Sequence, residues 1–370
     1  MSGGGGGAAG GDVVVVGGGV IGLASAWQLA RQGAAVTVVD PEPGSGASSV
    51  AAGMLAPVTE ARIGEEALLE LGLASLDRWP AFAAELEAAS GRSIGFRTEG
   101  TLVVAYDADD RAALVDLVDR QRSLGLDVDD LAARDLRQLE PTLAPAVRRG
   151  ARAATERAVD PKAVVAALLV ACERAGVTLL RRRVAQLPTG PDDRVRVALE
   201  GGDELAAPHV VLAAGAWSAD LADVPVRPVK GQVLTLRPRP GDDLLRHVVR
   251  AFVRGSVVYL VPRDDGRVVC GATMEERGWD RVPTAGAAYE LLRDVLLLVP
   301  GFDEAELLGT TVGFRPGTPD DLPRIGPSPD VEGLVLATGH HRNGILLTPL
   351  TADRVCAAVT GAGVDVGVAS

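Results

Sequence analysis

The chain has 370 residues, of which 47% are hydrophobic and 23% are charged, so it is long enough for two domains with separate hydrophobic cores. A net charge of −12 without any dense Lys/Arg block argues against binding to nucleic acid. Three widely spaced cysteines argue against a disulfide framework, and the longest apolar runs are shorter than the ~18–20 residues that cross a bilayer.

The N-terminal segment 1–11 is rich in glycine and contains neither a basic stretch nor an apolar stretch of the kind found in signal peptides. We therefore expect a disordered leader over residues 1–11 and a cytoplasmic protein with no membrane association.

The first ordered stretch combines a strand, a glycine-rich turn and a helix. Residues 13–16 are four valines, typical of a strand that is buried on both faces, and a helical pattern follows over 20–31. Between them Gly17, Gly19 and Gly22 match G-x-G-x-x-G, whose glycines serve the tight turn, the approach of a pyrophosphate and close helix packing. A second strand over 35–39 ends in Asp40, where a carboxylate binds a ribose hydroxyl. This pattern predicts dinucleotide binding, but the motif alone does not separate FAD from NAD.

Small residues dominate the next segment, 41–57. Ser48 and Ser49 are suited to cap a short helix that faces a second phosphate, and the small side chains around Gly53 would let a flat ring lie against the backbone. A flexible Gly/Ser loop is the alternative interpretation.

Helices are predicted over 65–90, with a break or kink at Pro80, and over 131–139 and 162–175. Closely spaced β-rich runs between 230 and 273 predict a separate antiparallel sheet.

The C-terminal part returns to an α/β pattern, with a strand over 333–338, a turn over 339–344 and a helix over 345–359. We therefore predict an α/β fold in which a discontinuous Rossmann-like nucleotide-binding domain is combined with a domain built on a largely antiparallel sheet. The expected ranges are 12–90, 154–222 and 323–370 for the first domain, and 91–153 and 223–322 for the second.

Six stretches together resemble the D-amino-acid-oxidase-like flavoproteins, and within that family the glycine oxidases of thiamine biosynthesis. The most specific are Gly-Phe-Arg-Pro-Gly-Thr-Pro-Asp at 313–320 and Gly-His-His-Arg-Asn-Gly-Ile-Leu-Leu at 339–347. The other four are 17–22, 46–56, 259–262 and 271–274.

The resemblance implies FAD as the cofactor. It is expected to be non-covalent, because the relatives with covalent flavin have a cysteine near the position of Gly313. The resemblance implies that FAD contacts the glycine turn, Asp40, the 47–54 segment and the turn at 340–346, and that the backbone of Val184 contacts the adenine. The residues concerned are Gly17, Gly19, Val20, Ile21, Gly22, Asp40, Ala47, Ser48, Ala52, Gly53, Met54, Val184, His340, Arg342, Asn343, Gly344, Ile345 and Leu346.

The resemblance also implies that Arg315 pairs with the substrate carboxylate, that Tyr259 assists it, and that Arg342 lies near the amine. This agrees with the chemistry of arginine, whose parallel N–H donors match a carboxylate as lysine cannot. The sequence offers no good general base and no metal-binding motif. Flavin-dependent amine oxidation requires neither, because the flavin accepts a hydride from the substrate carbon.

The expected activity is FAD-dependent oxidation of glycine, with sarcosine and small D-amino acids as further substrates, to an imine with production of hydrogen peroxide. The imine would supply thiazole formation, which links the enzyme to a thiazole synthase, and the resemblance suggests a homo-oligomer. Three alternatives remain open: a sarcosine or D-amino-acid oxidase, a dehydrogenase that uses another electron acceptor, and a flavin-binding scaffold with weak catalysis.

Overall fold

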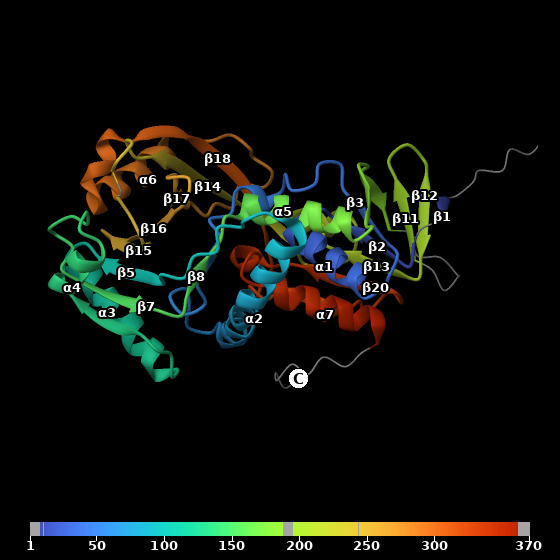
Figure 1. Cartoon of the computed structure of the whole chain (residues 1–370), viewed down its shortest axis with the longest axis horizontal. Coiled ribbons are helices and arrows are strands. Elements are labelled where there is room, and N and C mark those ends of the chain that lie inside the picture. The colour runs from blue at the N-terminus through green and yellow to red at the C-terminus, as the bar shows by residue number, and fades with distance from the viewer. Residues whose placement is uncertain (1–7, 10, 188–194, 243, 362–370) are drawn as a thin grey trace, which may run out of the picture.

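A computed structural model gives the structure of residues 8–9, 11–187, 195–242 and 244–361. Two large β-sheets lie toward opposite ends of the long axis of the molecule, as Figure 1 shows. The six-stranded sheet takes its strands from 13–39, 178–212 and 324–338, whereas the eight-stranded sheet takes them from 101–153 and 227–317. The chain therefore passes between the two sheets several times. The domain boundaries themselves stay a prediction.

The six-stranded sheet has the order β19-β20-β13-β2-β3-β9, and all neighbours are parallel except β19, which is antiparallel to β20. Its strands are β2 (Val13–Val16), β3 (Val36–Val39), β9 (Thr178–Leu180), β13 (His209–Leu212), β19 (Arg324–Pro327) and β20 (Leu334–Thr338). Because β2 lies between parallel neighbours, its carboxyl end opens at the same edge as those of β3 and β13, where nucleotides bind in such sheets.

Both faces of β2 are buried, as the run of valines predicts. Val13 and Val15 pack against helices, whereas Val14 and Val16 pack toward a small four-stranded sheet. The helices that share this core are α1 (Val20–Arg31), α2 (Glu66–Ser90), α5 (Pro161–Arg174) and α7 (Thr348–Thr360). The small sheet consists of β1 (Ala8–Ala9), β12 (Glu204–Ala207), β11 (Val195–Leu199) and β10 (Val184–Gln186).

The eight-stranded sheet has the order β18-β14-β17-β16-β15-β5-β7-β6 and is antiparallel except for the pair β15–β5. Its strands are β5 (Thr101–Ala105), β6 (Asp129–Ala132), β7 (Arg149–Ala153), β14 (Arg227–Arg237), β15 (Val248–Val253), β16 (Ser256–Pro262), β17 (Val268–Gly271) and β18 (Glu306–Gly317). Helix α6 (Ala285–Leu298) covers one face through Leu291 and Val295, and α3 (Ala108–Ser123) covers the β5–β7 end through Leu114 and Val118.

The remaining elements are short. They are the paired strands β4 (Met54–Leu55) and β8 (Arg157–Ala158), helix α4 (Ala133–Leu139), and the 3₁₀ turns η1 (Ala47–Ser49), η2 (Gly215–Asp220), η3 (Pro300–Glu304) and η4 (His341–Asn343).

Four local expectations need correction. Ala8–Ala9 forms a strand beside β12 within the segment expected to be a disordered leader; residues 1–7 and 10 lie outside the described residues. The helix expected over 131–139 begins only at Ala133, because the preceding residues pair with β7. Helix α2 is not broken at Pro80, which lies within it. The last helix begins at Thr348 rather than at 345, because residues 344–347 form a turn after η4.

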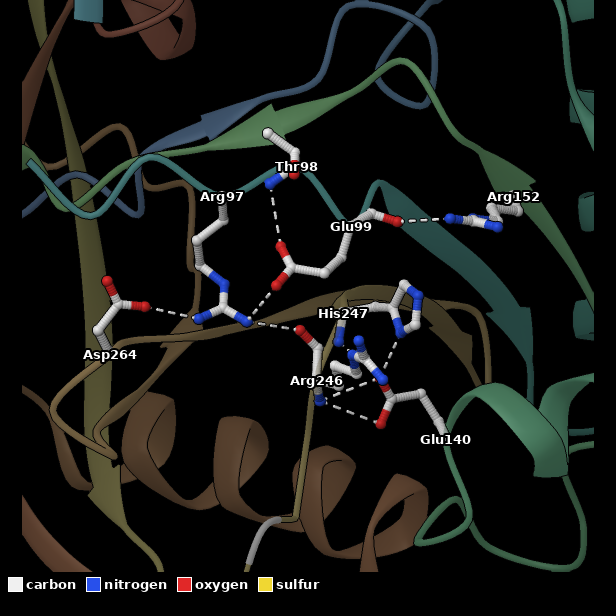
Figure 2. Close-up of polar contacts among 8 residues, drawn as sticks. All are labelled: Arg97, Thr98, Glu99, Glu140, Arg152, Arg246, His247 and Asp264. Atoms are coloured by element: carbon white, nitrogen blue, oxygen red, sulfur yellow. Dashed lines mark hydrogen bonds and ion pairs between the residues drawn. The ribbon is translucent and has the colours of Figure 1, made fainter. Parts of the chain in front are cut away.

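Polar contacts fix the segments that lead into the eight-stranded sheet (Figure 2). The Arg97 guanidinium donates to Asp264 Oδ1 (2.7 Å), Glu99 Oε1 (3.1 Å) and the Arg246 carbonyl (2.9 Å). Glu140 is only 2% exposed, and its Oε1 accepts the backbone N–H of His247 (2.5 Å) and approaches His247 Nδ1 at 2.7 Å. These contacts fix the start of β15, the strand that carries Arg250, a residue that lines the cavity described below.

Candidate functional site

A cavity of about 1120 Å³ extends from the glycine turn after β2 to the inner face of β14–β18. Both large sheets contribute to its lining, at the carboxyl ends of β2, β3 and β13 and across the floor formed by β14, β15, β16 and β18. The volume exceeds what one amino acid requires and is suited to a long ligand together with a small one.

The glycine turn is determined by close packing. Gly17 has φ +112, and a Cβ there would lie 2.6 Å from the Ala213 carbonyl carbon. A Cβ at Gly22 would overlap the Gly17 carbonyl oxygen, so Gly22 packs beneath the turn and does not line the cavity. Gly19 is different, because its nearest neighbour would be Ser48 Oγ at 3.5 Å, which leaves its backbone open to a ligand. Gly19 is also the N-cap of α1, where free N–H groups and the helix dipole favour phosphate.

Two side chains brace this turn. Asp40, at the end of β3, accepts the Gly18 N–H on Oδ2 (2.7 Å) and the Glu42 N–H on Oδ1 (2.8 Å) while it lines the cavity. Ser48 Oγ accepts the N–H of Val20 at 3.1 Å, so Ser48 satisfies the first turn of α1 from the neighbouring η1. The 41–57 segment is therefore an ordered wall of the cavity. The interpretation as a flexible loop is wrong for this segment.

The floor of the cavity carries the predicted substrate residues. Tyr259 on β16 is in register with Gly271 on β17, and a Cβ on Gly271 would lie 2.5 Å from the Tyr259 hydroxyl. Arg315 on β18 lies over Gly231 of β14, where a Cβ would lie 2.7 Å from Cζ and 2.8 Å from Nη2. Each of the two side chains therefore lies over a glycine, and the two lean toward each other across the sheet.

The electrostatics of this pair suit an anion. Arg315 Nη1 donates to the Thr273 carbonyl at 3.1 Å, which orients the guanidinium and leaves further N–H donors for a ligand. Burial raises the pKa of Tyr259 to about 12, opposed by the positive charge of Arg315, so the phenol remains protonated and can donate to a carboxylate.

The turn after β20 contributes two histidines of different kinds. His340 is buried with Nε2 3.0 Å from Thr351 Oγ1, and burial lowers its pKa to about 3, so its ring is neutral at ordinary pH. His341 has φ +44 and contacts Asp321, itself at φ +57, through Nδ1 at 2.8 Å. Burial lowers the pKa of His341, Arg315 and Arg342 lower it further, and Asp321 raises it. Neither imidazole is placed by these contacts as a general base.

Arg342 lines the cavity but is already engaged by acids. Its Nη2 donates to Glu65, and its Nε lies 3.7 Å from Glu60 Oε2. This arrangement was not foreseen, because Glu60 and Glu65 belong to a segment about 280 residues away in sequence.

The structure brings most of the predicted site residues to the one cavity. Three lie elsewhere: Gly22 under the turn, Asn343 in η4, and Leu346, whose carbonyl accepts from Trp79 Nε1 (2.8 Å) and Ser75 Oγ (2.6 Å) in the core. The predicted residues that line the cavity are Gly17, Gly19, Val20, Ile21, Asp40, Ala47, Ser48, Ala52, Gly53, Met54, Val184, Tyr259, Arg315, His340, Arg342, Gly344 and Ile345.

Sequence reasoning missed a second group of lining residues. Trp217 follows β13 and stacks on Trp279 with centroids 4.9 Å apart, and Trp279 meets Phe314 edge to face at 5.1 Å. The strand-to-glycine turn before Trp217 and the 313–320 stretch, which contains Phe314, were the available signals, and Trp279 itself is not among the lining residues. Glu60, Arg62, Arg250 and Arg281 also line the cavity, and no local motif marks them.

The residues present fit a dinucleotide cofactor such as FAD. The open backbone at Gly19, the α1 N-terminus and Asp40 lie at one end of the cavity, and the small residues Ala51, Ala52 and Gly53 lie between that end and Tyr259. Within the ranges that the structure describes, no three His, Cys, Asp or Glu side chains gather as a metal site. No helix in the described part of the chain is both long and apolar enough to cross a membrane.

Comparisons with known proteins give a consistent result. The sequence profile described as FAD dependent oxidoreductase matches residues 12–358. The glycine oxidase of Geobacillus kaustophilus is 36% identical over 340 residues, which is 90% of this chain and 88% of that protein. Its crystal structure superimposes with a TM-score of 0.89 at 34% identity, covering 97% of this chain and 96% of the other.

A longer relative is the bifunctional protein ThiO/ThiG of Synechocystis sp., which is 34% identical over 335 residues. The match covers 90% of this chain but only 49% of that protein, so the chain spans about half the length of such relatives.

Proposed function

The chain belongs to the FAD dependent oxidoreductase family, and on that premise we propose that it oxidises glycine, and with it sarcosine and small D-amino acids, to the imine, which water converts to glyoxylate. FAD held in the cavity would supply the acceptor for the hydride that leaves the substrate Cα, and its reoxidation by molecular oxygen would yield hydrogen peroxide. The similarity to glycine oxidases over most of both chains supports this activity.

The observation that carries the proposal is the pairing of Arg315 and Tyr259 over two glycines on the cavity floor. Arg315 binds the substrate carboxylate through the N–H groups that Thr273 leaves unused, and the Tyr259 hydroxyl donates to the same carboxylate. Holding the carboxylate at this fixed point orients the Cα of a small amino acid, which is the principal contribution the protein makes to a hydride transfer.

The residues proposed to hold FAD are those of the glycine turn, Asp40, the 47–54 segment, Val184 and the turn after β20. Non-covalent binding is part of the proposal: Gly313 faces the cavity and offers no thiol, and a Cβ there would lie 3.0 Å from Val50 Cβ, so a larger residue would require Val50 to shift.

A link to thiamine synthesis is supported by the ThiO/ThiG relatives. In these longer, bifunctional proteins, the part that matches this chain makes up about half of the length. We propose that the imine feeds thiazole formation by a separate thiazole synthase, and that the enzyme is a cytoplasmic homo-oligomer. Size-exclusion chromatography with light scattering tests the oligomer; a purely monomeric protein would contradict it.

The test of the proposed function compares Arg315→Ala with Arg315→Lys. Both variants should keep bound FAD, visible in the flavin absorbance, while the apparent affinity for glycine falls about tenfold or more. Lysine should rescue little, because it lacks the parallel donors of a guanidinium. Unchanged glycine kinetics in Arg315→Ala would remove Arg315 from the pocket, and dye reduction without peroxide would favour a dehydrogenase.

A further inference from the structure

A second group of charged side chains faces the cavity apart from Arg315. It consists of Glu60, Arg62, Glu65, Arg250 and Arg342, named here the arginine cluster. Glu60, Arg62 and Glu65 lie between β4 and α2, Arg250 lies on β15, and Arg342 lies in η4. All except Glu65 line the cavity. Elements from distant parts of the chain therefore converge on one charged wall.

The contacts within the arginine cluster leave donors unused. Arg250 Nη1 donates to Glu60 Oε1 at 2.8 Å, and Arg342 Nη2 donates to Glu65. Arg62 approaches Glu65 only at 3.9 Å. Arg250 Nε and Arg342 Nη1 are buried and have no hydrogen-bond partner within the described residues. Buried donors without partners are costly, so the protein's own acceptors do not fully satisfy the arginine cluster.

The charge of the arginine cluster is also unbalanced. Three guanidinium groups face two carboxylates, which leaves one net positive charge beside the cavity. Burial lowers the pKa of Arg62, and Arg342 lowers it further, whereas Glu65 and Glu60 raise it. The side chains of Arg250 and Arg342 are 12% and 13% exposed, so water screens their charge only in part.

The arginine cluster is distinct from the carboxylate site of the proposed function. Arg250 is in register with Tyr259 on the neighbouring strand, so both side chains point from the same face of the sheet. The Tyr259 phenol leans away from Arg250, over Gly271 and toward Arg315. Arg315 and the arginine cluster thus flank Tyr259, one on each side. A small zwitterionic amino acid whose carboxylate is bound at Arg315 places no negative charge at the arginine cluster.

We propose that the arginine cluster binds a second carboxylate of the substrate, so that this enzyme prefers amino acids with two carboxylates over glycine and sarcosine. The inference rests on the proposed function and names its substrate class. The reaction is unchanged: the Cα–H bond breaks with transfer of hydride to the flavin, the amine loses a proton as the C=N bond forms, and oxygen takes up the electrons as hydrogen peroxide.

A kinetic test compares iminodiacetate and D-aspartate with sarcosine and D-alanine, their counterparts with one carboxylate. We expect kcat/KM to be about tenfold higher for at least one dicarboxylate than for its counterpart. Preference for iminodiacetate would place the second carboxylate on the amine side, and preference for D-aspartate would place it on the Cα side. Equal or lower kcat/KM for both dicarboxylates would overturn the inference, while sarcosine and D-alanine turnover would still support the proposed function.

Two variants change the cluster charge in opposite directions. Arg62→Ala should lower the ratio of dicarboxylate to monocarboxylate kcat/KM about fivefold, a modest loss because Arg62 is 46% exposed. Glu65→Gln should raise that ratio, because the amide oxygen can still accept from Arg342 while one negative charge is removed. Arg92→Ala, an exposed arginine outside the cavity lining, is the matched control and should keep the ratio. If neither Arg62→Ala nor Glu65→Gln changed the ratio of dicarboxylate to monocarboxylate kcat/KM, the assignment would be overturned.

A binding test avoids turnover altogether. Oxydiacetate and methoxyacetate have an ether oxygen in place of the amine, so they cannot be oxidised to an imine, and their binding to the FAD-loaded enzyme can be followed by the flavin absorbance. We expect a Kd about tenfold lower for oxydiacetate, with the difference reduced in Arg62→Ala. Equal Kd values would contradict the second carboxylate site even if no amine were oxidised, so the two proposals fail separately.

Discussion

The substitution Gly231→Ala tests the geometry of the substrate carboxylate site without touching Arg315 itself. The added Cβ would lie 2.7 Å from Arg315 Cζ and 2.8 Å from Nη2, where carbon contacts are normally about 3.5–4.0 Å. The guanidinium must therefore move by about 1 Å. A displacement of that size at a positioning group costs roughly 10²-fold in rate.

We expect Gly231→Ala to fold normally, because the obstructing atoms belong to the end of a flexible side chain, and to keep its FAD. The value of kcat/KM for glycine, measured as peroxide release, should fall about 10²-fold. Gly286→Ala is the control, since a Cβ at that α6 position meets nothing within 4 Å. A Gly231→Ala enzyme with kcat/KM close to that of the wild type would refute the view that Arg315 must lie over Gly231 to bind substrate.

Three further predictions concern the fold and the cofactor. Glu156 is fully buried against Thr59, and burial raises its pKa from 4.5 to about 7, so the stability it contributes is present below pH 4.5 and lost as pH rises through 7. Glu156→Gln should therefore gain about 3 kcal/mol over the wild type at pH 8.5 but not at pH 4.5, as measured by urea unfolding. Gly19→Ala should keep the circular dichroism spectrum of the wild type but bind FAD weakly. Gly22→Ala should fail to fold, because its Cβ would meet backbone atoms of the turn. If the two variants folded equally well and bound FAD equally, the packing described for the glycine turn would be contradicted. Glu140→Gln should lower the free energy of unfolding by about 3 kcal/mol, because the amide NH2 that replaces Oε2 cannot accept the Arg246 N–H and the buried carboxylate loses its charge, and an unchanged urea midpoint would show that the network is not stabilising.

Local patterns predicted the nucleotide half of the molecule well. The four valines of β2, the glycine turn and Asp40 are close in sequence, and their spacing is dictated by one strand, one turn and one helix. The mixed α/β fold, the family and FAD as its cofactor are confirmed by the match over residues 12–358 and by the similarity to the glycine oxidase structure.

The substrate end could be predicted only through the resemblance to a family. Arg315, Tyr259 and Gly231 lie on three different strands, and nothing in their local sequence shows that they share one face of a sheet. Apart from Arg342, the arginine cluster was missed for the same reason, because Glu60 meets Arg250 and Arg342 only through the tertiary fold. Their roles in binding substrate remain proposals.

Boundaries were the weakest predictions where two elements compete for the same residues. The helix expected from 131 loses its first residues to strand β6, because pairing with β7 satisfies backbone groups that a longer helix would also use. At the C-terminal turn, residues 344–347 form a hydrogen-bonded turn in which the Leu347 N–H donates to the Asn343 carbonyl (2.8 Å), so α7 begins at Thr348, later than its apolar pattern indicates.

The most direct measurement is peroxide production by the purified, FAD-loaded protein supplied in turn with glycine, sarcosine, D-alanine, D-proline and L-alanine. The account predicts peroxide from glycine and sarcosine, little from L-alanine, and an oxygen uptake equal to the peroxide formed. A protein that binds FAD but releases no peroxide from any of these amines would contradict the proposed oxidase activity.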